Sequence, residues 1–116
     1  MIVVTTNDLP GYRIIAVHGV ARGLTVRSRS LLGNIGGAVQ SLFGGSISVY
    51  VNLAETARQE AYDLLVKHAD DMGANAIVAM RYDANEIMDG ITEVLAYGTA
   101  VTVEAQPVQA QPGQPA

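Results

Sequence analysis

Hydrophobic residues alternate with small or polar ones along several segments of the chain, and this alternation predicts β-strands. A short strand is expected at residues 2–5, a long one at 12–26 and two more at 76–82 and 91–104. Asp89-Gly90 predicts a tight hairpin turn between the last two. In the last strand, one set of alternate positions holds Val94, Ala96, Gly98 and Ala100, and the other holds Leu95, Tyr97, Thr99, Val101 and Val103.

Two further segments carry hydrophobic residues at helical spacing. The first is capped by Ser30 and runs to about Phe43, and the second is capped by Asn52 and ends before Gly73. A brief strand is expected between them at 46–51. The expected fold class is α+β, with a small antiparallel sheet and two helices in the order ββ-α-α-ββ. The inner face predicted for the second helix consists of Leu53, Ala57, Ala61, Leu64, Leu65, His68 and Met72.

The predicted strands are apolar or small on both faces, which points to a partner. In segment 76–82, Ala76, Val78, Met80 and Tyr82 are expected on one face, and Ile77, Ala79 and Arg81 on the other. An antiparallel sheet with one solvated face would carry polar residues at alternate positions. Two helices cover only one face, so we expect a second copy of the chain to cover the other. The composition agrees, since 49% of the residues are hydrophobic and only 16% charged.

The predicted domain spans residues 1–104. Residues 105–116 are rich in Pro and Gln and nearly uncharged, so we expect a disordered tail. The N-terminus lacks the basic and apolar regions of a signal peptide, and no apolar run approaches the ~20 residues of a membrane-spanning helix. We therefore expect a cytoplasmic protein with no membrane contact.

Composition and motifs argue against several function classes. The net charge of −4, with no Lys/Arg cluster among aromatic residues, argues against nucleic-acid binding. The chain has no cysteine, and hence neither disulfides nor thiolate ligands. No nucleophile elbow, dinucleotide-binding loop or P-loop occurs. We expect neither an enzyme nor a bound cofactor.

Taken together, five segments resemble the YbjQ-like family of small, uncharacterised bacterial proteins. These segments are residues 5–14, 23–29, 42–45, 73–83 and 93–101, in order along the predicted domain. The resemblance implies an α+β, dodecin-like subunit that assembles into a homopentameric ring through its sheets. The family is often labelled a heavy-metal-binding domain, but no motif transfers that label to particular residues here.

The side chains themselves offer few ligands for a metal ion. Soft metals prefer thiolates and thioethers, and the borderline donors here are His18 and His68. The two histidines have no ligand spacing such as i, i+4, so no metal site is predicted within one chain. A site shared between subunits stays open. Segment 83–90 carries several acidic residues but departs from the EF-hand pattern at Ile87 and Met88.

The strongest local basic cluster predicts an anion site. Arg22, Arg27 and Arg29 precede Ser30, where a strand would enter a helix N-terminus, a geometry that binds anions. Ion pairing between subunits with acids such as Glu55 or Glu60, or simple solvation, is the alternative. The leading interpretation is a non-catalytic binding or scaffold protein that forms a homo-oligomer, for which a pentamer is expected. A metal-binding protein with an intersubunit site, or a binder of a small anion or metabolite, remains open.

Overall fold

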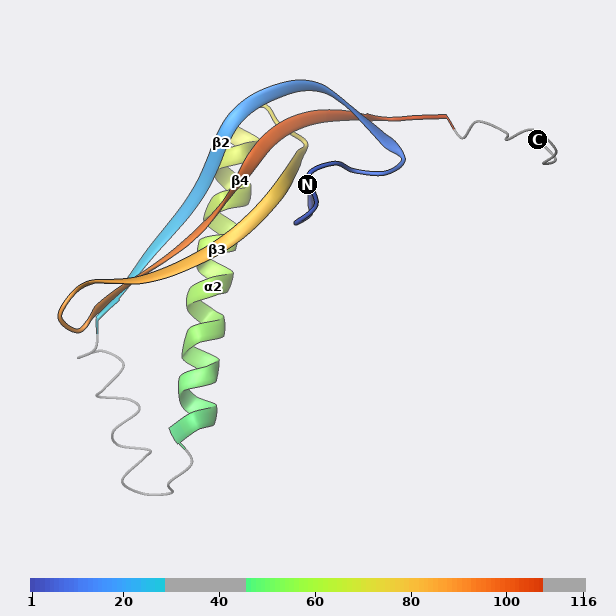
Figure 1. The fold of residues 1–116 in the computed structure, drawn as a ribbon. Helices are drawn as coiled ribbons and strands as arrows, with labels where there is room; N and C mark the ends of the chain where they lie inside the picture. Colours follow the sequence, from blue (N-terminus) through green and yellow to red (C-terminus); the bar gives the residue numbers. More distant parts are fainter. Residues whose placement is uncertain (29–45, 108–116) are drawn as a thin grey trace.

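A computed structural model describes residues 1–28 and 46–107, which form a four-stranded sheet with one helix on one face (Figure 1). Strands β2 and β3 both pair antiparallel with β4, and β1 pairs parallel with β3, in the order β1-β3-β4-β2. The elements are β1 (Ile2–Val3), β2 (Tyr12–Ser28), α2 (Ser46–Asp71), β3 (Ala76–Met88) and β4 (Ile91–Ala105).

The predicted antiparallel sheet with two helices is wrong. The described residues hold one helix and a mixed sheet, in the order β-β-α-β-β. The sheet is mixed because β1 runs beside β3 in the same direction, and the path of the chain decides this, not any local pattern. The helix predicted at 30–43 lies outside the described residues.

The start of the second predicted helix is also corrected. A brief strand was expected at 46–51, but α2 begins at Ser46 and includes these residues. Asn52 therefore lies inside the helix, where its backbone carbonyl accepts a hydrogen bond from the Thr56 hydroxyl at 2.9 Å. The predicted end before Gly73 is confirmed, and Gly73 adopts φ +89° just after the helix.

Helix α2 packs unusually close to the sheet because small residues line the contact. Ala57, Ala61 and Ala69 are buried on its inner face. A Cβ added to Gly23 of β2 would lie 2.0 Å from the Ala61 carbonyl oxygen, so the backbones of strand and helix nearly touch. Leu64, predicted on the inner face, is instead 45% exposed.

The alternation predicted in β4 is confirmed. Val94, Ala96 and Ala100 belong to the core beneath α2, and Val101 and Val103 belong to a second cluster on the opposite face. In β3 the predicted alternation fails after Val78. Ala79 adopts φ 54°, and the pairing register with β4 shifts between Val78 and Arg81.

This bulge in β3 exchanges the faces of the residues that follow it. Met80 joins Ile77 in the core beneath α2, whereas Val78 packs in the cluster on the other face. Tyr82 pairs with the buried Ala96 and therefore also lies on the α2 side.

The β3–β4 hairpin extends further than the alternation indicated. Residues 83–88, of which Asp83, Asn85 and Glu86 are polar, continue β3 and pair with β4, and the chain turns at Asp89-Gly90 with Gly90 at φ +75°. The predicted hairpin turn is thus confirmed. The structure measures 66 × 31 × 17 Å, with a radius of gyration of 19.6 Å against about 12 to 13 Å for a compact chain of similar length.

Candidate functional site: an open sheet face and three pockets

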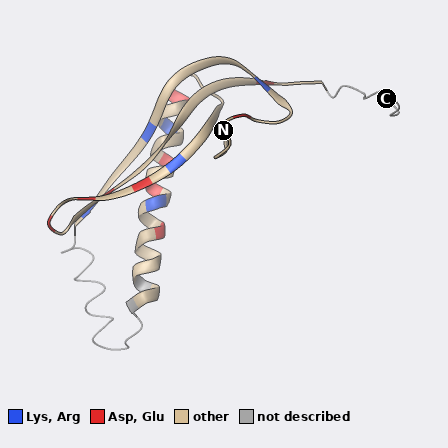
Figure 2. Cartoon of the chain, in the orientation of Figure 1, with Lys and Arg blue, Asp and Glu red and all other residues tan. Residues whose placement is uncertain are grey.

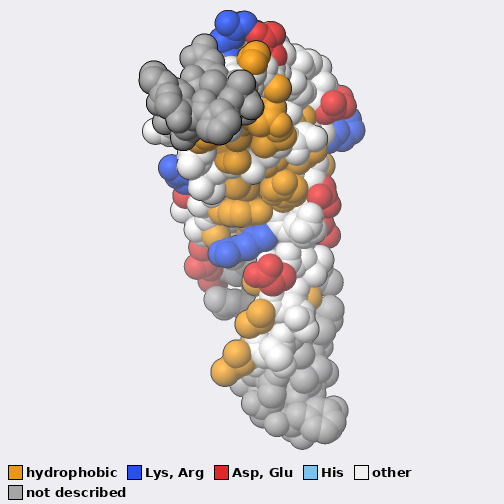
Figure 3. Space-filling view, turned by 90° about the vertical axis from the view of Figure 1, so that its right-hand side faces the viewer, with side chains coloured by type: hydrophobic (Ala, Val, Ile, Leu, Met, Phe, Trp, Pro, Cys, Tyr) orange, Lys and Arg blue, Asp and Glu red, His pale blue; other side chains and the backbone are white. Residues whose placement is uncertain are grey.

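The sheet face opposite α2 carries a row of exposed aliphatic side chains on β2. Val17 and Val20 are each 67% exposed, and Leu24 and Val26 are about half exposed. We call these four residues the open face. Their neighbours across the β2–β4 pairing include Leu95 and Thr99. Figure 3 shows hydrophobic side chains gathered on the side that it views, with charged groups around them.

The N-terminal segment covers only one end of this sheet face. Ile2, Val4 and Leu9 pack on Ala76, Val78, Val101 and Val103. The Arg81 guanidinium holds this segment in place by donating to the Thr5 carbonyl oxygen at 2.8 Å. The open face lies beyond the covered end, and none of the described residues forms a layer over it.

Charged residues also lie on the sheet face opposite α2. Arg22 and Arg81 both pair across β4 at Tyr97, and Glu93 pairs with Val26 on one side and Asn85 on the other. Figure 2 shows acidic and basic residues spread along the strands and α2, with no large block of one sign. The open face therefore lies on a sheet face that also carries isolated charges of both signs.

The two histidines are held by different partners. His68 accepts a hydrogen bond on Nδ1 from the backbone N–H of Arg22 at 3.0 Å. Since β2 is an edge strand, this N–H has no strand partner, and the imidazole supplies one. His18 Nε2 lies 2.7 Å from the Thr102 hydroxyl. Among the described residues no three His, Cys, Asp or Glu side chains are grouped to hold a metal ion.

The predicted anion site is only partly within the described residues, since Arg29 and Ser30 lie outside them. Arg22 is exposed, on the sheet face opposite α2. Arg27 forms an ion pair with Glu60 of α2. Arg27 thus pairs with one of the two acids named in the alternative, but within its own chain and not between subunits. The anion site itself stays a prediction.

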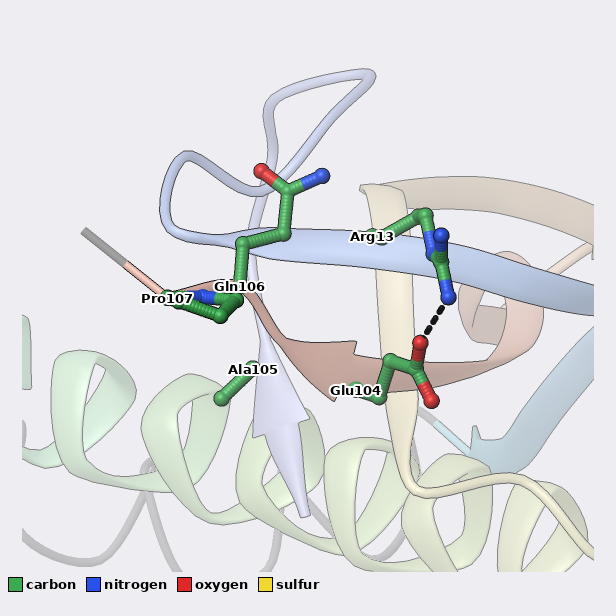
Figure 4. A pocket seen from close by; sticks show the side chains of 5 residues that line it. All are labelled: Arg13, Glu104, Ala105, Gln106 and Pro107. Atoms are coloured by element: carbon green, nitrogen blue, oxygen red, sulfur yellow. Dashed lines mark hydrogen bonds and ion pairs between the residues drawn. The ribbon is translucent and has the colours of Figure 1, made fainter. Parts of the chain in front are cut away.

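Two pockets in the described part of the chain are open to solvent, and the first of them has a mainly polar lining. One, of about 550 Å³, lies at the far end of the β2–β4 ladder, where Arg13 forms an ion pair with Glu104 beside Gln106 and Pro107 (Figure 4). Another, of about 510 Å³, lies beside α2. There the Lys67 ammonium lies 2.9 Å from the Asp71 carboxylate, and this hydrogen bond raises the pKa of Lys67. In the first pocket the Arg13 guanidinium already pairs with Glu104, and the charged residues that line the second are Asp63, Lys67 and Asp70.

The third pocket, of about 190 Å³, lies between the first half of α2 and the hairpin end of the sheet. The Arg58 guanidinium stands 5.9 Å from the centre of the Tyr82 ring beside it. Burial is the main cause that raises the pKa of the Tyr82 phenol above 10.0, while Arg58 lowers it. The lining residues are Arg27, Tyr50, Leu53, Ala54, Ala57, Arg58, Ala84, Thr92 and Val94.

Sequence reasoning missed this pocket because Arg58 is not among the residues predicted for the inner face of the helix, and Tyr82 was predicted on the same sheet face as Ala76 and Val78. The bulge at Ala79 brings Tyr82 to the α2 side. A local irregularity of this kind leaves no sequence signal when the residue is not glycine.

Comparison with known proteins agrees with this architecture. A family model, YbjQ_1, described as "Putative heavy-metal-binding", matches residues 1–104. The chain belongs to the YbjQ family. The resemblance seen in the sequence is confirmed, and the match covers nearly all the described residues of this YbjQ chain.

Similar proteins carry a family name and no stated activity. A "UPF0145 protein" of Solibacter usitatus is 54% identical over 101 residues, covering 87% of this chain and 90% of its own. One from Burkholderia thailandensis is 59% identical over 100 residues, covering 86% and 90%. One from Chromobacterium violaceum is 58% identical over 102 residues, covering 88% and 87%.

A solved structure from Pediococcus pentosaceus, described as a protein of unknown function in the DUF74 family, has the same fold. Its TM-score is 0.59 at 21% identity, and the match covers 90% of this chain and 98% of that one. Within residues 1–28 and 46–107, no helix of this YbjQ protein is both long enough and apolar enough to cross a membrane.

Proposed function

We propose that this protein is a non-catalytic homo-oligomer, a pentameric ring, whose assembled surface serves binding or scaffolding. The observation that carries the proposal is the open face, formed by Val17, Val20, Leu24 and Val26 on a sheet that α2 covers on one side only. An exposed apolar surface of this kind usually marks a contact with another protein.

The free energy available from covering the open face is substantial. Each of its four side chains is about half to two-thirds exposed, and full burial of such a side chain contributes about 1.5–3 kcal/mol. Covering the exposed part of all four contributes on the order of 4 kcal/mol per chain. This supports a contact that forms at micromolar concentration when other surfaces join it.

The edges of the sheet support a cyclic arrangement. Strand β2 forms one edge of the sheet along its 17 residues, and an edge strand offers backbone groups to a neighbouring chain except where they already have a partner, as the Arg22 N–H has in His68. A ring of five requires a contact between two different surfaces of the subunit. Ile47 and Val51 at the start of α2 are exposed and offer a second apolar surface.

Light scattering coupled to a sizing column tests the proposal. We expect a single species with a mass close to five times the chain mass of 12.2 kDa. The double variant Val20→Lys/Leu24→Lys places charges on the open face and should dissociate the ring. A matched control, Thr56→Lys/Gln59→Lys on the exposed side of α2, should keep the native mass. A monodisperse wild-type monomer at micromolar concentration would refute the proposal.

Metal binding by residues of several copies is the second candidate, and the description of the family favours it. His18 is exposed and belongs to β2, whose edge a neighbouring copy would meet. Without cysteine, we expect weak or no binding of zinc, copper or cadmium in calorimetric titrations. Stoichiometric sub-micromolar binding that is lost in His18→Ala, with His68→Ala as comparison, would instead establish the metal site.

A further inference from the structure

The third pocket exists because α2 and the sheet diverge. Near Gly23 the helix and β2 are in backbone contact. From there the straight helix and the curved strands separate toward the β3–β4 hairpin (Figure 1). Ala54 and Ala57 of α2 and Ala84 of β3 are too small to fill the resulting wedge, and the 190 Å³ pocket remains.

The floor and the rims of this pocket differ in character. Leu53, Ala57 and Val94 form an apolar floor, and the hydroxyl-bearing residues Tyr50 and Thr92 also line the pocket. Two guanidinium groups stand at opposite rims. Arg27 comes from β2 and Arg58 faces Tyr82 of β3.

The two arginines are not electrostatically equivalent. Glu60 neutralises Arg27 in an ion pair. In the described part of the chain Arg58 forms no ion pair, and its guanidinium lies over the Tyr82 ring. The ring orients the guanidinium without neutralising it, so the pocket keeps a guanidinium without an ion-pair partner beside its apolar floor, while the Glu55 carboxylate is near enough to act on the same Tyr82 phenol.

We infer that this pocket binds a small organic carboxylate with a flat apolar body, whose carboxylate pairs with Arg58. The volume suits a single-ring ligand, because a cavity of about 150 Å³ accommodates benzene. The guanidinium presents a planar fork of donors that matches a carboxylate. Of the two described residues of the anion site predicted from sequence, Arg27 lines this pocket and Arg22 does not.

This inference does not rest on the proposed assembly, because every lining residue belongs to one chain. Benzoate, benzamide and benzamidinium provide a test, since they share one shape and differ in charge. Calorimetry and amide chemical shifts on the full chain measure their binding. We expect benzoate to bind saturably at one site per chain, about tenfold more tightly than benzamide, with benzamidinium the weakest. The shifts should centre on Ala57, Thr92 and Val94.

Variants separate the contributions of charge and cavity. Arg58→Gln should reduce benzoate affinity about tenfold and leave benzamide unchanged. The matched control Arg13→Gln, at the far end of β2, should change neither. Ala54→Leu and Ala84→Leu fill the pocket from opposite walls at exposed positions, and each should abolish binding of both ligands.

Three results would overturn the inference. These are absence of saturable benzoate binding, equal effects of Arg58→Gln and Arg13→Gln, and a preference for benzamidinium. The native mass of each variant is measured in parallel. A variant that loses benzoate binding at unchanged native mass tests the pocket alone. A variant that changes native mass and still binds benzoate tests the assembly alone.

Discussion

Replacing Gly23 by alanine should cost far more than the same change at Gly73, where a new Cβ would meet no atom within 4 Å. The new Cβ would lie 2.0 Å from the Ala61 carbonyl oxygen, 2.4 Å from the Leu65 amide nitrogen and 2.9 Å from the Leu64 Cβ. Two of these three atoms belong to the helix backbone, which no side-chain rotation can remove. Helix α2 must therefore move away from β2 along its buried alanine row.

The magnitude follows from the packing around this point. Overpacking a core by a methyl group costs about 1–3 kcal/mol even where side chains can yield. Here the backbone has to yield, and the shift also separates Ala57 and Leu65 from the sheet, so we expect a loss of at least about 3 kcal/mol in the free energy of unfolding. For a domain of this size that corresponds to roughly 12 °C or more in Tm.

Thermal and denaturant unfolding at one fixed protein concentration measure this loss. Gly73→Ala is the matched control, because it adds the same methyl group in open space at φ +89° and should cost only about 1 kcal/mol. A second substitution, Ala61→Gly, should fail to rescue Gly23→Ala, since the clash involves the backbone of Ala61. A loss no greater than that of Gly73→Ala, or rescue by Ala61→Gly, would refute the close contact.

Three further predictions follow from individual contacts. The Asn75 side chain exchanges two hydrogen bonds with the backbone of Val103, at 2.8 and 2.9 Å, so Asn75→Ala should lower the free energy of unfolding by about 1–3 kcal/mol in denaturant titrations, and an unchanged midpoint would contradict this. Burial raises the pKa of Tyr82 above 10.0, so the folded state disfavours the phenolate. The contribution of the neutral phenol to stability is therefore present below pH 10 and is lost as the pH rises through the raised pKa. Tyr82→Phe should flatten the alkaline limb of a plot of unfolding free energy against pH. Truncation after Pro107 should leave Tm and native mass unchanged, because a segment rich in Pro and Gln offers little apolar surface for burial. Truncation after Glu104 also removes the hydrogen bond from Gln106 N to Gly11 O and should lower Tm. A lower Tm after the first truncation would show that the tail packs against a neighbour.

The candidate sites were only partly predictable from sequence. The apolar pattern on both strand faces identified the open face, because side-chain alternation in a strand is a local property. The pocket beside Arg58 was not predictable, since it depends on how the straight helix leaves the curved sheet. The role of His68 was likewise hidden, because its partner is a backbone N–H 46 residues away in sequence.

By itself, the sequence determined the features that rest on local chemistry. These are the two faces of β4, the end of α2 before Gly73, the turn at Asp89-Gly90 and membership of the YbjQ family. Tertiary structure alone decided the parallel pairing of β1, the bulge at Ala79 and the extension of β3 through residues 83–88. In each of these the backbone follows a ladder of hydrogen bonds with a distant strand, and that ladder outweighs the preferences of the residues it joins.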